Sequence, residues 1–185
     1  MKLDNIQELK PKSDTKEKAE AAVKTLIEYI GEDPGREGLV ETPARVIRAF
    51  AEHFSGYHAD PISILQKRFE AGGYDGPIVL EGIEFVSHCE HHLAPFFGTV
   101  KISYVPNGRV VGLSKLARLV DVFAKRLQLQ ERLTLQIAET INNVLGPKAV
   151  LVEVTANHSC LNFRGANKSC AEMSTRSSFG DIDLL

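Results

Sequence analysis

The chain has 185 residues, enough for one domain with a substantial buried core. Its hydrophobic content of 43% and charged content of 25% are ordinary for a soluble globular protein. The 22 Lys and Arg residues balance 24 Asp and Glu residues, so the net charge of −2 argues against nucleic acid or an anionic membrane as partner. No apolar run approaches the roughly 20 residues of a membrane span, and the start of the chain lacks a signal-peptide core. We therefore expect a cytoplasmic protein.

The first part of the chain predicts helices. We expect the first dozen residues to fray, and the apolar spacing over residues 13–31 predicts the first helix. A second helix is predicted to start with Thr42 as N-cap and Pro43 as first helical residue, and to end before residue 56. Residues 61–70 are expected to form a short further helix.

From Pro77 onward, β-branched and aromatic residues predict strands. An Asn107-Gly108 hairpin turn is expected after the second strand, and two amphipathic helices precede the last strands. This order predicts an α+β fold with an antiparallel sheet, helices packed on one face, and preceding N-terminal helices. We expect a helical region over 1–75 and a sheet-bearing region over 76–185 in one compact unit. The predicted strands are 77–88, 96–106, 109–113, 149–160, 161–165 and 172–179, and the two helices are 116–127 and 133–145.

Residues 88–92 read HCEHH and bring a thiol, a carboxylate and three imidazoles together. Thiolate and imidazole are ligands that zinc prefers. If the segment forms a turn, residues three apart share a side, so Cys89 and His92 pair while His91 faces elsewhere. A lone His88 serves structure or solubility more often than catalysis. The cluster as a whole predicts metal chemistry.

The third ligand is expected on the strand predicted over 149–160, where side chains alternate between faces. Its apolar face continues in register to His158 and Cys160. A cysteine on such a face is usually a small buried hydrophobe, but this one follows a histidine of the same parity, and we choose it as ligand. Cys170 follows a polar stretch and is interpreted as incidental. Three ligands leave a position for water, as in hydrolytic metal sites, which disfavours a structural zinc module.

A basic helix start predicts an anion site. In GLSKLARLV we expect Ser114 at the N-cap and Lys115 and Arg118 in the first turn, where a cation opposes the helix dipole by roughly 0.3–1 kcal/mol. Either these are solvated side chains that tolerate the penalty, or a bound phosphate reverses the sign of the interaction. Arg45 and Arg48 repeat the pattern near the start of the second predicted helix.

Four segments are similar to one known family. They are GREGLVETPARV, CEHHLAPFFG, YVPNGRVVGLSKLARLVDVFAKRLQLQERLTLQIA and HSCLNFRG, and they span roughly residues 35 to 165. The combination of CEHH, GLSKLAR and QERLT in one chain is very specific, and the sequence resembles the GTP cyclohydrolase I family. The resemblance weakens after Gly165, where ANKSCAEMSTRSSFG is only loosely family-like and DIDLL stands without the family's final helical segment.

The resemblance implies a tunnelling fold (T-fold) for the catalytic domain over 76–185 and a homodecamer with active sites at subunit interfaces. It implies zinc as cofactor and the conversion of GTP and water to formate and 7,8-dihydroneopterin triphosphate, the entry to folate or biopterin synthesis. Residue by residue, it implies Cys89, His92 and Cys160 as zinc ligands, and His91, His158, Ser114 near the ribose and Gln130 as catalytic residues. It implies Glu131 on the guanine edge, and Lys115, Arg118, Arg164, Arg45 and Arg48 on the triphosphate, the last two from another subunit.

Two alternatives stay open within this resemblance. A family member could stop at an opened formamide intermediate or make another pterin, but Ser114, His91 and His158 are all present and argue against it. A catalytically silent paralogue that binds nucleotide or a partner would be expected to lose a ligand or a histidine, and none is missing.

Overall fold

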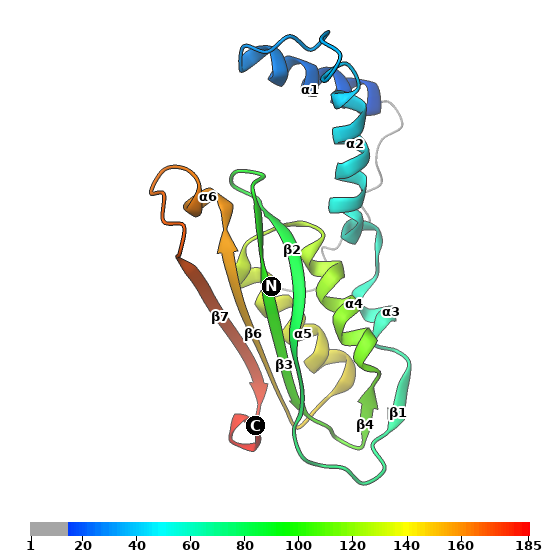
Figure 1. The fold of residues 1–185 in the computed structure, drawn as a ribbon. Coiled ribbons are helices and arrows are strands. Elements are labelled where there is room, and N and C mark those ends of the chain that lie inside the picture. Colours follow the sequence, from blue (N-terminus) through cyan, green and yellow to red (C-terminus); the bar gives the residue numbers. More distant parts are fainter. Residues whose placement is uncertain (1–14) are drawn as a thin grey trace. The chain divides into compact units, whose positions relative to one another are not determined.

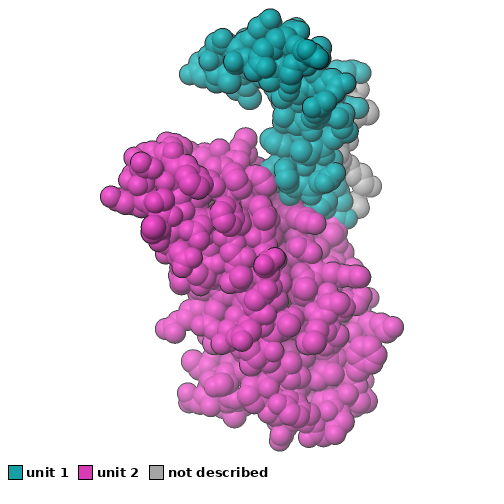
Figure 2. Space-filling model, viewed as in Figure 1, with its two compact units in different colours: residues 1–58 teal, residues 59–185 magenta. Residues whose placement is uncertain are grey.

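The computed structural model describes residues 15–185, so the first dozen residues, expected to fray, lie outside the described part. The chain divides into two compact units, residues 1–58 and 59–185 (Figure 2). The expected division at residues 75 and 76 stays a prediction. Along the part of the chain that the structure describes, no helix is long and apolar enough to cross a membrane.

The first unit is helical. It contains α1 (Lys16–Tyr29), α2 (Thr42–His53) and the short 3-10 helix η3 (Ser55–His58). Both long helices were predicted from their apolar spacing and are confirmed. The N-cap of α2 is Glu41 rather than Thr42, so that expectation was wrong by one residue.

The second unit is an α+β layer structure, as predicted. A five-stranded sheet has the strand order β5-β2-β3-β6-β7. The pairs β2–β3, β3–β6 and β6–β7 are antiparallel, and only the two-residue strand β5 pairs in parallel, with the end of β2. Helices α4 and α5 cover one face of this sheet (Figure 1). The sheet strands are β2 (Ile78–Cys89), β3 (Pro95–Val105), β5 (Leu127–Gln128), β6 (Ala149–His158) and β7 (Glu172–Gly180), and the helices are α4 (Leu113–Ala124) and α5 (Gln130–Leu145).

The core lies between the sheet and these two helices. The alternating face predicted for β6 is buried completely: Val150, Val152, Val154 and Ala156 are at most 1% exposed. Side chains at helical spacing on α4 and α5 meet this face, and each large apolar side chain buried there contributes roughly 1.5–3 kcal/mol. The helix residues of this core include Leu116, Leu119, Val120, Phe123, Leu133, Ile137 and Ile141.

Three local predictions were wrong. Residues 61–70 form one helical turn, α3 (Pro61–Ile64), and then strand β1 (Arg68–Glu70) rather than one helix. Asn107 and Gly108 form a bend, but β3 does not pair with β4 (Arg109–Val111), because β4 pairs with β1 in a separate two-stranded sheet. Residues 161–165 form no strand, since the chain turns into α6 (Ser159–Asn162) directly after β6. A short 3-10 helix, η4 (Ile182–Leu184), follows β7.

Candidate metal centre and surrounding site

The turn between β2 and β3 carries two of the predicted metal ligands. Cys89 is the last residue of β2 and is buried, whereas His92 is exposed within the turn. Backbone bonds from Leu93 N to Cys89 O (2.9 Å) and from Cys89 N to Ala94 O (2.8 Å) close the turn. Leu93 has a φ of +54°, a left-handed conformation that lets the chain reverse within these few residues. The turn thus brings Cys89 and His92 together, as predicted. His91 was expected to face elsewhere, but its ring also reaches the sulfur of Cys89.

The third predicted ligand comes from the far end of β6. Ligand atoms of Cys89, His92 and Cys160 all lie within 4.8 Å of one another. Cys160 does not continue the strand, however, because β6 ends at His158 and Cys160 lies in the turn of α6. The parity argument therefore named a residue that the structure brings to this cluster, although the strand stops short of it. The short helical turn aims the thiol back at the end of β2.

The donor set suits a soft or borderline metal ion. Two thiols and an imidazole are typical zinc ligands, and three protein ligands leave a fourth position open. Burial raises the pKa of the Cys160 thiol, the adjacent Cys89 adds to this rise, and the guanidinium of Arg164 opposes it. A cation between the sulfur atoms would instead favour both thiolates. The residues present therefore fit a bound metal ion.

His158 lies beside this cluster and is held on two sides. Its ring stacks on Phe96, with centroids 4.5 Å apart and an angle of 4° between the planes. This stack follows from the sheet register, in which Phe96 is the direct partner of His158 across β3 and β6. Burial lowers the pKa of His158, and the carboxylate of Glu131 opposes this shift. Phe96 was not among the predicted site residues, because strand pairing is not visible in sequence.

Gln130, at the start of α5, reaches His158 from the core. Its Oε1 lies 2.8 Å from His158 Nε2. Its amide nitrogen donates to the carbonyl oxygens of Val154 (3.1 Å) and Met173 (2.9 Å), and contacts the Thr175 hydroxyl at 3.2 Å. Because carbonyls only accept, the amide orientation is determined by its surroundings. The oxygen of Gln130 therefore faces the imidazole.

Four further predicted residues lie in the turn after β2 and at the start of α4. His91 is exposed, and its Nδ1 lies 3.9 Å from the sulfur of Cys89. The prediction of Ser114 as N-cap was wrong, because Ser114 is the second residue of α4. The N-cap is Gly112, which has an extended backbone and whose carbonyl oxygen accepts a hydrogen bond from Lys115 N at 2.8 Å. Glycine is well tolerated at that position. Lys115 is partly buried and lies in the first turn of α4 as expected, whereas Arg118 is exposed and lies in the second turn, because the helix starts earlier than predicted.

Arg45 and Arg48 belong to the first unit. Both are exposed on α2, and Arg45 forms an ion pair with Glu41 one turn earlier. Their expected participation in a triphosphate site of another subunit stays a prediction.

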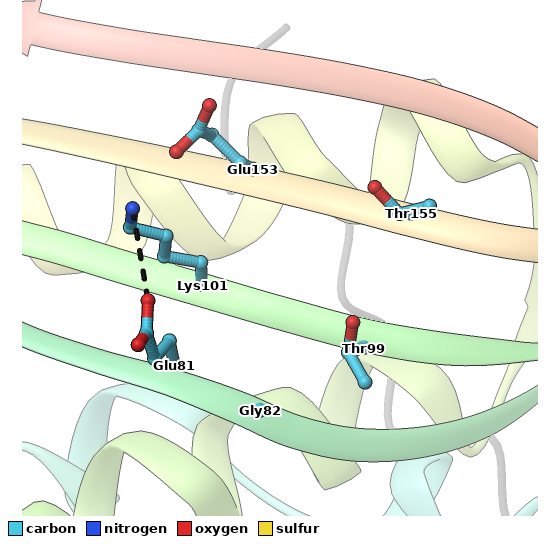
Figure 3. Close-up of a pocket in the computed structure, with 6 residues that line it drawn as sticks. All are labelled: Glu81, Gly82, Thr99, Lys101, Glu153 and Thr155. Atoms are coloured by element: carbon cyan, nitrogen blue, oxygen red, sulfur yellow. Dashed lines mark ion pairs between the residues drawn. The ribbon is translucent and has the colours of Figure 1, made fainter.

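A hollow on the other face of the sheet contains none of the predicted site residues. It opens on the face opposite to α4 and α5, where Lys101 pairs with Glu81 at 3.7 Å (Figure 3). Its lining alternates with buried core residues such as Val100 and Ile102 along β3. We assign no chemistry to this hollow, because it holds no cluster of catalytic or metal-ligating type. The lining residues are Glu81, Gly82, Thr99, Lys101, Glu153 and Thr155.

Comparison with known proteins identifies the family. Residues 19–183 match the family described as GTP cyclohydrolase I. This chain belongs to the GTP cyclohydrolase I family. It is 51% identical over 165 residues to GTP cyclohydrolase 1 of Pelagibacter ubique (strain HTCC1062), which covers 89% of this chain and 82% of that protein. It is also 51% identical over 165 residues to GTP cyclohydrolase 1 of Rickettsia bellii (strain OSU 85-389), covering 89% and 86%.

A third relative is also a GTP cyclohydrolase 1, and one solved structure is similar over part of the chain. GTP cyclohydrolase 1 of Brucella suis (strain ATCC 23445 / NCTC 10510) is 48% identical over 168 residues, covering 90% of this chain and 79% of that protein. The crystal structure of the archaeosine synthase QueF-Like in the apo form superposes with a TM-score of 0.48 at 20% identity, covering 57% of this chain and 95% of that one. Family membership confirms the resemblance read from CEHH, GLSKLAR and QERLT, and the α+β layers described above are those of its tunnelling fold.

Proposed function

We propose that this protein hydrolyses GTP at guanine C8, releases formate and forms 7,8-dihydroneopterin triphosphate, the first step of folate and pterin biosynthesis. The observation that carries the proposal is the cluster of Cys89, His92 and Cys160 in a chain of the GTP cyclohydrolase I family. The His158–Gln130 pair supports it, because it places a positioned imidazole beside the cluster. We further propose that the protein works in the cytoplasm, where its three free cysteines would stay reduced.

The proposed cofactor is Zn²⁺, held by Cys89, His92 and Cys160. The chemistry of the ligands supports zinc over harder ions, since Mg²⁺ and Ca²⁺ prefer oxygen ligands. When bound, zinc supplies Lewis acidity that makes water nucleophilic near neutral pH. The protein's contribution is the geometry of the turn after β2 and of α6, which converge on one point from segments about seventy residues apart.

Proton transfer is assigned to histidines. Imidazole changes charge near neutral pH and serves as general acid or base once it is positioned within reach of the reacting group. The ring of His158 is fixed by the Phe96 stack and the Gln130 hydrogen bond, which suits it to move protons at C8 and N7 of guanine. His91, adjacent to the Cys89 sulfur, is proposed as the second proton-transfer group.

Guanine recognition is assigned to Glu131 at the N-terminal end of α5. Its exposed carboxylate can accept hydrogen bonds from the N1–H and 2-amino groups of guanine, which adenine does not offer. Glu131 directly follows Gln130, which hydrogen-bonds to His158, and its carboxylate raises the pKa of His158 against the larger effect of burial. Recognition of the base and proton transfer would thus occur within one pocket.

The triphosphate is assigned to the basic residues. Lys115 and Arg118 in α4 and Arg164 after α6 would neutralise it by charge-assisted hydrogen bonds, and Arg45 and Arg48 are proposed to join from another subunit. Ser114, beside Lys115, is proposed to contact the ribose. Arg164 acts on Cys160 in the structure, which supports a position near the metal cluster.

We propose a homodecamer with active sites at subunit interfaces. Within residues 59–185, strand β7 lies at one edge of the sheet, and only two residues of β2 pair with β5 at the other. Unpaired strand edges favour pairing with another chain. Light scattering of the purified protein is expected to show a large assembly. A fully active monomer would contradict both the shared sites and the proposed role of Arg45 and Arg48.

The proposed reaction is tested by incubating the purified, zinc-loaded protein with GTP and measuring formate and a fluorescent pterin separately. Equal amounts of both products are expected. Formate without pterin would identify an enzyme that opens the ring and releases formate but does not reclose it, and neither product would contradict the proposal. The Cys160→Ser variant is the matched control for contaminating activity.

A further inference from the structure

Arg132 joins the metal-binding turn to the start of α5. It is the third residue of α5, directly after Glu131, and its guanidinium forms an ion pair with the carboxylate of Glu90, which stands between Cys89 and His91 in sequence. The two side chains are only 32% and 31% exposed. This pair connects two segments that are 42 positions apart in the chain.

The same guanidinium makes two further hydrogen bonds. Its Nε donates to Gln128 Oε1 at 2.9 Å, and its terminal nitrogen donates to the carbonyl oxygen of Leu127 at 3.1 Å. Gln128 is 2% exposed and is itself held by the Phe123 carbonyl (3.0 Å). The rigid fork of arginine can satisfy several acceptors at once, which lysine cannot do with the same geometry. These bonds hold the Arg132 side chain against β5, and from there its guanidinium also contacts Glu90 in the turn.

Backbone pairing with β5 also holds the turn on this side. Strand β5 pairs with β2 only at His88–Leu127 and Cys89–Gln128. One more backbone bond, from Glu90 N to Gln128 O at 3.1 Å, continues this pairing into the turn. The Arg132–Glu90 pair adds the side-chain link at the residue between ligand Cys89 and the rest of the turn.

We propose that Arg132 and Glu90 are positioning residues for the metal centre. Their pair holds the turn that carries Cys89 and His92 in the geometry that meets Cys160. Because Arg132 follows Gln130 and Glu131 on α5, it also sets the distance between the metal ligands and the groups that hold His158 and guanine. This inference rests on the zinc site of the proposed function. It gives a role to two residues of the CEHH and QERLT segments that no ligand or substrate assignment uses.

Replacing residues that hold metal ligands in place typically changes metal affinity by 10–100-fold. The Arg132→Met variant keeps an unbranched apolar stem but loses all donors of the guanidinium, so zinc affinity is expected to fall by about that factor. The Glu90→Gln variant leaves the bonds from Arg132 to β5 intact and removes only the charged link to the turn. The zinc affinity of Glu90→Gln is expected to fall less than that of Arg132→Met. The double variant is expected to bind zinc no more weakly than Arg132→Met alone, because the two side chains act as one unit.

The test is competition for zinc between the full-length protein and a chromophoric chelator, without GTP, so that turnover plays no part. Lys101→Met is the matched control, since it breaks the exposed ion pair with Glu81 on the opposite sheet face and should leave zinc affinity unchanged. The thermal midpoint of each metal-free protein is measured in parallel. Loss of zinc affinity in Glu90→Gln at an unchanged thermal midpoint supports positioning.

The outcomes separate this inference from the proposed function. If the parent binds zinc and both Arg132→Met and Glu90→Gln bind it as tightly as the parent, the inference is overturned and the zinc site stands. If zinc affinity falls equally in Lys101→Met, the effect is unspecific and the inference is also overturned. If the parent itself binds no zinc, the proposed function fails first.

Discussion

The side-chain oxygen of Gln130 lies 2.8 Å from Nε2 of His158. Because the Gln130 amide nitrogen donates to two carbonyl oxygens, its oxygen can only accept, and Nε2 of the neutral imidazole must carry the proton. Nδ1 is then the free acceptor. A glutamine buried at 1% exposure thus determines which nitrogen of His158 can receive a proton.

Replacing His158 tests its role in proton transfer. His158→Ala is expected to bind zinc and GTP but to turn over more slowly by a factor of about 10²–10⁴, because a positioned acid–base group is lost. Gln130→Leu is expected to reduce kcat while ¹⁵N NMR of His158 shows a mixture of tautomers in place of the Nε2–H form. Turnover close to that of the parent in His158→Ala would remove this residue from the mechanism.

The metal assignment distinguishes two cysteines. Cys160→Ser is expected to lose zinc and activity, because the ligand atoms of Cys89 and His92 alone cannot complete a three-ligand set. Cys170→Ser is the control, since Cys170 is exposed and its sulfur lies 3.9 Å from the hydroxyl of its neighbour Ser169. Metal analysis of both purified variants decides the matter, and a normal zinc content in the Cys160 variant would refute the ligand set.

Periodicity predicted the parts of the fold in which one face is buried. The residues at alternate positions from Val150 to Ala156 and at helical spacing from Leu133 to Ile141 are all in the core, because burial of one face imposes its period on the sequence. The partner of β4 was not predictable in this way. Two three-residue strands, β1 and β4, find each other across a separation of about forty residues, and nothing local in RVV specifies that pairing.

The candidate site shows the same limit. Cys89 and His92 are close in sequence, so a local turn was enough to pair them. Glu90, by contrast, looked like one more candidate of the cluster, and only the folded chain shows its carboxylate on Arg132. Contacts between segments depend on strand register and helix placement, which residue types alone do not reveal.

Gly98 is expected to tolerate no side chain. It lies opposite Ala156 in the β3–β6 pair, and a Cβ atom there would lie 1.9 Å from the carbonyl oxygen of Thr155. Because that atom belongs to backbone in the centre of the sheet, Gly98→Ala should lower the free energy of unfolding by about 3 kcal/mol or prevent folding. Gly112→Ala is the control, since its Cβ would meet only the Lys115 side chain at 4.0 Å, and its loss of stability should be limited to the roughly 1 kcal/mol of a weaker N-cap. Urea unfolding followed by circular dichroism measures both, and equal stabilities would contradict the packing described here.

The buried Tyr104 is expected to make the protein less stable at alkaline pH. Burial raises its pKa, and the weaker opposing influence is a hydrogen bond from Val111 N at 3.5 Å. A raised pKa means that the unfolded chain loses its proton first, so the contribution of Tyr104 is complete below its usual pKa of about 10 and is lost as the pH rises through the folded value. Unfolding free energies between about pH 8 and pH 11 should fall more steeply in the parent than in Tyr104→Phe. Parallel curves would show that the phenol ionises equally in both states.

The last prediction concerns the triphosphate. Lys115 lies in the first turn of α4, where a cation opposes the helix dipole, and Arg118 lies about one turn further along the helix. A bound triphosphate would remove the conflict at Lys115 and would pair with both charges. Hydrogen bonds to charged groups contribute roughly 1.5–3 kcal/mol each, so three basic contacts should favour GTP over GMP by about 10³ or more in kcat/KM. Arg164→Ala should remove part of this preference while zinc stays bound. Arg176→Ala is the matched control, because it deletes the same charge at an exposed position of β7. Arg176 lies opposite Glu153 in the strand register, on the face of the sheet away from the helices. Equal kcat/KM for GTP and GMP in the parent would show that these basic residues are only a solvated surface. An equal loss of the GTP preference in both variants would attribute it to net charge rather than to contact with the phosphates.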